Sequence, residues 1–193
     1  MENYAIIICG GKSTRMGSDK ALIEYDGEPM LLHHVRAFLD RSWRVVVTGV
    51  DVEKEKILRG MAVEIVPLNA ERGKRGPIRG ILSGLGVVPD NTWIHLSPCD
   101  APHLIDTILD SSQALGGDLI NMPIWSNGDE WFSEPLWSCG SKESFRKAIL
   151  EGEGPLYIRF RQLGCNEVII TLPYPWISSL NTPVDIERIS LME

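Results

Sequence analysis

The residues best suited to chemistry lie in a short stretch near the start of the chain. An apolar run ends there at Gly10 and Gly11, and three cations follow within the next nine positions, at Lys12, Arg15 and Lys20. Glycine lets backbone amides approach a ligand closely, and clustered amides combined with positive charge bind phosphate. The stretch therefore predicts a loop that holds a phosphate chain.

Two familiar phosphate-binding loops do not fit this stretch. A Walker A loop would need glycine at position 6, where the chain has isoleucine. A dinucleotide fingerprint would need a different glycine spacing from 10, 11 and 17, and an acid where the second predicted strand ends at Thr48. A plain turn between strand and helix, with solvated cations, is the non-functional alternative.

A carboxylate follows a second apolar run farther along the chain. Trp93 to Leu96 predicts a buried strand, and Asp100 comes shortly after it. Open parallel sheets bind ligands at the carboxyl ends of their strands, and a carboxylate there can hold Mg²⁺ against a triphosphate. Asp100 could instead cap a helix, because Pro102 suits a first helical turn. Position alone leaves both interpretations open.

A basic loop lies between a predicted strand and the helix expected from Pro77. Its cations are Arg72, Lys74 and Arg75. They could hold an anionic substrate, although charged loops are often only exposed connections. The whole chain carries a net charge of −7, whereas positions 10–20 and 71–79 carry +2 and +3. Positive potential is therefore concentrated in two loops.

The elements that must position these residues follow from hydrophobic periodicity. Strands are expected at 4–9, 43–47, 61–66, 93–96, 167–172 and 176–180, and helices from Pro29, at 51–59, from Pro77, from near Pro102, at 141–151 and at 156–163. The pattern predicts an α/β fold of three layers, a mostly parallel twisted sheet with helices on both faces. Because linkers and repeats are absent from the sequence, we expect a single domain over 1–193.

A small β-hairpin excursion is expected near 118–139. Alternating apolar residues lead to Asn127-Gly128, a strong hairpin signal, with Glu134 to Cys139 as the returning strand. Tryptophans 125, 131 and 137 are expected to be ordinary packing residues, with stacking on a flat ligand ring or a dimer contact as alternatives.

Other charged and titratable residues predict no further site. His33 and His34 are expected on a helix surface, and the alternating charges of 51–59 on a solvated helix face. The four cysteines are dispersed, which indicates free thiols rather than zinc ligands or disulfides. The negative charge argues against nucleic acid, and the absence of a long apolar run or signal peptide predicts a cytoplasmic protein without membrane contact.

Four segments resemble one enzyme family. The run G-G-K-S-T-R-M-G-S-D-K-A-L from Gly10 resembles the signature of nucleotidyltransferases, most closely the MobA-like molybdenum cofactor guanylyltransferases. Three later segments extend the resemblance in the family's order: G-P-I-R-G-I-L-S from Gly76, P-C-D-A-P from Pro98 and N-T-P-V-D from Asn181. Together they span nearly the whole chain.

The resemblance implies a Rossmann-like nucleotidyltransferase fold and a Mg²⁺-dependent reaction. GMP from GTP would be joined to the terminal phosphate of molybdopterin loaded with molybdenum or tungsten, and pyrophosphate released. The implied catalytic residues are Arg15, Lys20 and Asp100, with Asp100 as the metal ligand. The implied nucleotide-binding residues are Ile8, Cys9, Gly10, Gly11, Lys20, Thr48, Asn69 and Asp100, and the implied acceptor-binding residues are Arg72, Lys74, Arg75 and Asn181.

The base and the partners are less closely specified. Guanine-using members have asparagine at the end of the second strand and aspartate after the third, where this chain has Thr48 and Asn69. An aspartate accepts two hydrogen bonds from guanine, whereas an amide offers one acceptor and one donor group, so CTP is an alternative. Another small-metabolite guanylyltransferase and a non-catalytic nucleotide-binding protein are further alternatives. The resemblance also implies partners that insert molybdenum or mature molybdoenzymes, and we expect a monomer or weak homo-oligomer.

Overall fold

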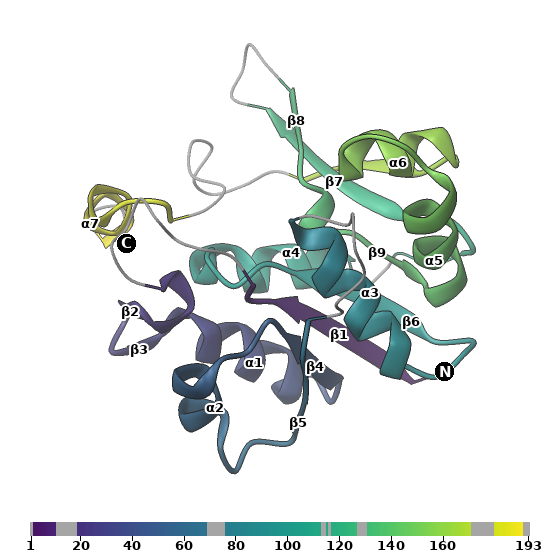
Figure 1. Cartoon of the computed structure of the whole chain (residues 1–193). Helices are drawn as coiled ribbons and strands as arrows, with labels where there is room; N and C mark the ends of the chain where they lie inside the picture. Colours follow the sequence, from purple (N-terminus) through teal and green to yellow (C-terminus); the bar gives the residue numbers. More distant parts are fainter. Residues whose placement is uncertain are drawn as a thin grey trace.

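A mixed, mostly parallel sheet forms the centre of the computed structural model (Figure 1), which describes residues 2–10, 19–68, 76–112, 115, 117–126, 131–170 and 180–190. Within these residues the main sheet has eight strands in the order β10-β7-β9-β6-β1-β4-β5, and β8 pairs with β7. The strands are β1 (Asn3–Ile8), β4 (Arg44–Thr48), β5 (Val63–Val66), β6 (Trp93–Ser97), β7 (Asn121–Ser126), β8 (Trp131–Ser133), β9 (Cys139–Ser141) and β10 (Asn166–Ile169), and β2 (Glu24–Tyr25) pairs with β3 (Glu28–Pro29) separately.

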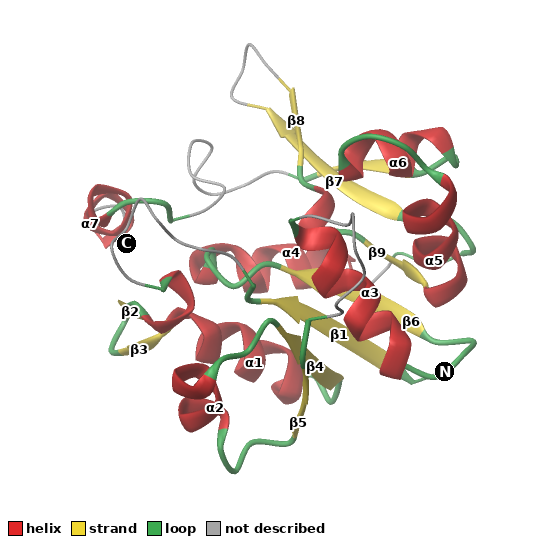
Figure 2. Cartoon of the chain, in the orientation of Figure 1, coloured by secondary structure: helices red, strands yellow, loops and turns green. Residues whose placement is uncertain are grey.

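Helices cover both faces of this sheet (Figure 2). They are α1 (Met30–Asp40), α2 (Val52–Leu58), α3 (Pro77–Val87), α4 (Ile105–Ser112), α5 (Lys142–Glu151), α6 (Leu156–Gln162) and α7 (Pro183–Ser190), with short 3-10 turns η1 (Lys20–Leu22), η2 (Pro102–Leu104) and η3 (Pro135–Trp137). None of the described helices is long and apolar enough to cross a bilayer. The layered α/β architecture predicted from the sequence is confirmed.

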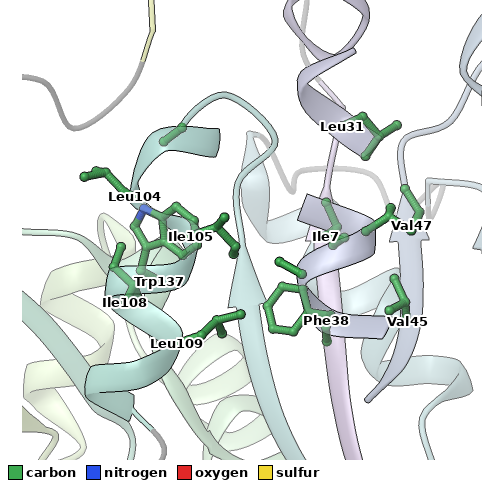
Figure 3. Packing of buried hydrophobic residues seen from close by; sticks show 14 of the residues in the cluster. Ile7, Leu31, Phe38, Val45, Val47, Leu104, Ile105, Ile108, Leu109 and Trp137 are labelled. Carbon is green, nitrogen blue, oxygen red and sulfur yellow. The ribbon is translucent and has the colours of Figure 1, made fainter. Parts of the chain in front are cut away.

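Strand β1 is the middle of the sheet. It pairs in parallel with β4 on one edge and with β6 on the other. Its odd residues, Ala5 and Ile7, pack into a core with α1 and α4 (Figure 3), and its even residues, Ile6 and Ile8, pack into a second core with α3, α5 and α6. Burial on both faces explains why this strand is a continuous apolar run in the sequence.

Two glycines let α3 approach the sheet closely. A Cβ on Gly80 would lie 2.9 Å from Thr48 Oγ1, and one on Gly84 would lie 2.6 Å from Ile6 Cγ2. Both separations are shorter than normal van der Waals contacts, so a side chain there would push the helix away from β1 and β4. The weak helix propensity of this segment is therefore explained by close packing.

The hairpin is shorter than the sequence predicted. The returning strand of the hairpin is β8, at Trp131–Ser133, and of the predicted 134–139 only Cys139 lies in a strand, β9, which also pairs antiparallel with β7. Pro135 has no N–H to donate to a ladder and begins the turn η3 instead. Trp125 and Trp137 are buried as expected, whereas Trp131 is exposed. The predicted turn at Asn127-Gly128 and the predicted strand at 176–180 lie outside the described residues, apart from Leu180.

His34 is buried, and its predicted surface position is wrong. It lies three residues after Leu31 and four before Phe38, so it shares the apolar face of α1. Its Nδ1 lies 2.9 Å from Ser97 Oγ, and its ring stacks on Trp137. His95, on β6, is also fully buried and contacts the ring of Phe38. His33 is only half-buried.

These two buried histidines make stability sensitive to mild acid. Burial lowers the pKa of His34 from 6.5 to about 3 and that of His95 from 6.5 to about 4. Below pH 6.5 the unfolded chain takes up protons that the folded chain does not, so the free energy of unfolding falls as the pH falls. We expect urea unfolding to show a loss of about 2 kcal/mol per histidine between pH 7.5 and pH 5. Equal stability at the two pH values would contradict the burial of both imidazoles.

A second prediction concerns the contact between the ends of β1 and β4. Gly49 has φ +80°, and a Cβ on it would lie 2.4 Å from Gly10 N. Gly60 has φ +86° with nothing within 4 Å, so it is the matched control. Both G49A and G60A should incur about 1 kcal/mol of backbone strain, but only G49A must also displace backbone. Urea unfolding should show a clearly larger loss for G49A, and equal losses would mean that the contact imposes no constraint.

Candidate active site

The carboxyl ends of three parallel strands meet at one edge of the sheet. Gly10 follows β1, Gly49 follows β4, and Asp100 lies three residues beyond β6. Cys9 N donates a hydrogen bond to Thr48 O at 2.9 Å, which holds the first two chain segments together. Ligands of open α/β sheets bind at such an edge, and the predicted phosphate loop leaves β1 there.

A cation, a carboxylate and an amide from three distant segments come together at this edge. Lys20 Nζ lies 3.0 Å from Asp100 Oδ2 and also donates to Asn181 Oδ1. The Lys20 and Asp100 side chains are 17% and 22% exposed, so they are partly desolvated but open to a ligand. Three residues predicted for the site from separate motifs therefore form one cluster.

Local structure fixes each member of this cluster. Lys20 is the first residue of η1, and Asp19 caps that turn by accepting from Ala21 N at 3.0 Å. The closing N-T-P-V-D segment is held by Asp185, whose Oδ2 accepts from Asn181 N at 2.9 Å and from Thr182 N at 2.7 Å. The caps supply backbone partners that the helix ends otherwise lack.

Asp100 is not a helix cap. The following turn, η2, has Ala101 at its N-cap position and no side-chain hydrogen bond there. Asp100 uses its backbone carbonyl to accept from Leu180 N at 2.7 Å, while its carboxylate faces Lys20. The backbone bond fastens the closing segment to the residue after β6, and the carboxylate remains at the site.

The oxygens of Asp100 and Asn181 suit a hard cation. Mg²⁺ prefers oxygen ligands and is usually held by one or two protein groups together with water and substrate phosphates. In the described part of the chain, no group of three or more His, Cys, Asp or Glu side chains is placed so that it could hold a metal ion. The donor set therefore fits an ion that is shared with a phosphate ligand, rather than one enclosed by protein alone.

Lys54 corrects the prediction of a fully solvated α2. Glu53 and Lys56 form an exposed ion pair as expected, but the Lys54 side chain is only 2% exposed. Its Nζ lies 2.5 Å from Asp19 Oδ2 and 2.6 Å from Asp51 Oδ2. The signal was present in the sequence, because Lys54 lies four residues before the buried Leu58 and so shares its helix face.

Other predicted nucleotide-binding residues lie beneath the site. The side chains of Ile8, Cys9 and Thr48 are buried, and Thr48 Oγ1 donates to Ile7 O at 3.4 Å. Burial raises the pKa of the Cys9 thiol, and a hydrogen bond with Cys99 raises it further, so the thiol stays protonated. Contact of these residues with a nucleotide remains a prediction. Several other predicted residues lie outside the described ranges: Gly11, Arg15, Asn69, Arg72, Lys74 and Arg75.

Comparisons with known proteins agree with the site's motifs. The profile of the MobA-like NTP transferase domain matches residues 5–159. The chain is 30% identical to a probable molybdenum cofactor guanylyltransferase from Pyrococcus horikoshii, over 93% of each protein. It is also 30% identical to a molybdenum cofactor biosynthesis bifunctional protein from Synechocystis, over 71% of this chain but only 38% of that longer relative.

The fold agrees with a solved structure as well. A nucleotidyl transferase from Methanothermobacter superposes with a TM-score of 0.75, and the match covers 97% of this chain and 95% of the other at 19% identity. The family profile spans most of the chain, including Lys20 and Asp100 of the site cluster. The chain therefore belongs to the MobA-like NTP transferase domain family.

Proposed function

We propose that this protein transfers GMP from GTP to the terminal phosphate of metal-loaded molybdopterin and releases pyrophosphate. Family membership supports nucleotidyl transfer, and the names of the relatives support the acceptor. The observation that carries the proposal is the convergence of Lys20, Asp100 and Asn181 at the carboxyl edge of the sheet. Charge of both signs at that edge is what a triphosphate and its counterion require.

The reaction needs no nucleophile from the protein. A terminal phosphate oxygen of the acceptor attacks the α-phosphorus of the nucleotide in line, and a new P–O bond forms. The bond from the α-phosphorus to the bridging oxygen breaks, and its electron pair leaves with pyrophosphate. A phosphate monoester is largely ionised at pH 7, because its second pKa is about 6, so no general base is required. Positioning and charge neutralisation remain the protein's tasks.

Lys20 is suited to the charge that develops on the phosphates. Its ammonium is held in place by Asp100 and Asn181 before any ligand arrives, so little reorganisation is needed when a phosphate binds. The Gly10 backbone lies against Gly49 at the start of the phosphate loop. Arg15 is proposed to neutralise charge on the phosphates of the nucleotide. The cations at 72, 74 and 75 are proposed to do the same for the phosphate of the acceptor.

Mg²⁺ is proposed as the cofactor. When bound, it would neutralise charge on the triphosphate and polarise the phosphorus under attack. Asp100 is the residue that would hold it, because its carboxylate has a second oxygen besides the Oδ2 that pairs with Lys20. Proteins that insert molybdenum or mature molybdoenzymes remain expected partners.

The choice of base is proposed to depend on the segment around Asn69 more than on Thr48. The Thr48 side chain is fully buried, and Gly80 of α3 lies directly over its hydroxyl. A larger residue at position 48 would collide with α3. Threonine in place of the asparagine of guanine-using members is therefore explained by the close packing of α3. The departure at Asn69 keeps CTP as the second candidate donor.

Substitution of Asp100 tests its role in catalysis. Asp100→Asn keeps the shape of the side chain but removes the charge, so turnover should fall by about 100-fold or more. Asp106→Asn is the matched control, since Asp106 is 73% exposed and pairs with Arg41 at the surface. Both variants should unfold within about 1 kcal/mol of the parent protein in urea. Near-normal turnover of folded Asp100→Asn would remove Asp100 from the catalytic centre.

A pyrophosphate-release assay identifies the nucleotide donor. Purified protein with Mg²⁺ and metal-loaded molybdopterin should release pyrophosphate with GTP, and not with ATP or UTP. Release with CTP would instead assign the cytidylyl reaction. Nucleotide binding without release from any of the four would contradict molybdopterin as the acceptor, and would favour another acceptor or a non-catalytic role. Omission of Mg²⁺ should abolish release.

A further inference from the structure

Lys54 is a buried cation away from the reacting groups. Its side chain is 2% exposed, and lysine is rarely buried to this degree without charged partners. Both partners are carboxylates, Asp19 Oδ2 at 2.5 Å and Asp51 Oδ2 at 2.6 Å. Burial alone lowers the pKa of Lys54, but these two hydrogen bonds raise it above its ordinary value, so the ammonium stays charged.

The two partners have different roles. Asp51 is local, since it caps α2 and accepts from Glu53 N and Lys54 N. Asp19 is 35 residues away and immediately precedes Lys20. The bond between Lys54 and Asp19 is therefore the one that connects α2 to the functional cluster.

Asp19 is held through both of its oxygens. Oδ2 accepts from Lys54, and Oδ1 accepts from Ala21 N in the first turn of η1. Asp19 O also accepts from Leu22 N at 3.0 Å. With three bonds on one residue, the backbone at Asp19 and Lys20 has little freedom to rotate. The direction in which the Lys20 side chain leaves the backbone is fixed accordingly.

The ion pair of Lys54 and Asp19 binds the chain where it leaves the predicted phosphate loop. Stability alone does not account for such a pair, because buried ion pairs can often be replaced by apolar residues without loss.

We propose that Lys54 is a positioning residue that acts through Asp19 to hold Lys20 opposite Asp100 and Asn181. Its ammonium is buried and bound to two carboxylates. It sets the end point of the phosphate loop against α2, so that the Lys20 ammonium is correctly placed when the transition state forms. This inference rests on the proposed nucleotidyl transfer for its effect on turnover.

The test compares Lys54→Met with Lys56→Met, a control on the same helix whose side chain is 57% exposed and paired only with Glu53. Lys54→Met should lower kcat by about 10- to 100-fold, while KM for the nucleotide changes by less than about threefold. This split is expected because misplacement of Lys20 acts mainly on the transition state. Lys54→Arg, which restores the charge and the donors, should recover most of kcat, and Lys56→Met should match the parent protein.

Amide hydrogen exchange of residues 19–23 gives a readout that does not need turnover. Lys54→Met should speed exchange there by about fivefold or more, with no change in β1 or β6, and Lys56→Met should not. If the parent protein shows no pyrophosphate release with any nucleotide, the proposed function fails, while exchange still decides whether Lys54 holds this segment. Parent-like kcat and exchange in folded Lys54→Met would overturn the inference.

A second variant covers the case in which Lys54→Met does not fold. Asp19→Asn keeps an oxygen for Ala21 N and leaves Lys54 paired with Asp51, so the fold should be retained. It should reproduce the loss of kcat and the faster exchange at 19–23. Asp51→Asn removes only the local partner and should have the smaller effect on kcat. Equal effects of the two substitutions would contradict a role for Lys54 through Asp19.

Discussion

The burial of β1 on both faces is the constraint on which the rest of the structure depends. Its neighbours β4 and β6 run parallel to it, so three strands deliver their carboxyl ends to one edge. Side chains of α1 and α4 fill one face and those of α3, α5 and α6 fill the other. Because helices occupy both faces, a large polar ligand is directed to the edge. The glycines at 10, 49, 80 and 84 make the required close approaches possible.

Electrostatic contacts then turn this edge into a site. Lys20 is shared between Asp100 and Asn181, and Asp19 beside it is shared between Lys54 and η1. Each of the two lysines is therefore neutralised by a carboxylate from a distant segment, Lys20 by Asp100 and Lys54 by Asp19. A partly desolvated arrangement of this kind makes each charge more effective than it would be in water. The site is therefore assembled by the tertiary structure, because Lys20, Asp100 and Asn181 come from segments that are far apart in the sequence.

The relation to known proteins has two levels. The match to the family profile and to relatives near 30% identity establishes the family. The superposition at 19% identity establishes the fold, and many chemistries share a fold of this kind. The acceptor, the base and the metal therefore depend on the site's own chemistry. Among the described residues that chemistry is the cluster of Lys20, Asp100 and Asn181, to which we assign the proposed binding of phosphate and metal.

The sequence by itself determined the strands β1, β4, β5 and β6, the doubly covered sheet and the motifs of the site, but not the returning strand of the hairpin. Continuous apolar runs and glycine-rich ends at residues such as Gly10 are local signals. Apart from the resemblance to a family, the sequence could not determine that Lys20, Asp100 and Asn181 meet. Their contacts span 80 and 161 residues, and such contacts follow from the way the strands pair. Asp100 as a cap or a site residue, and Lys54 as a surface or a buried cation, were likewise decided by the tertiary structure. In each case local pattern allows two environments, and only packing against a distant segment selects one.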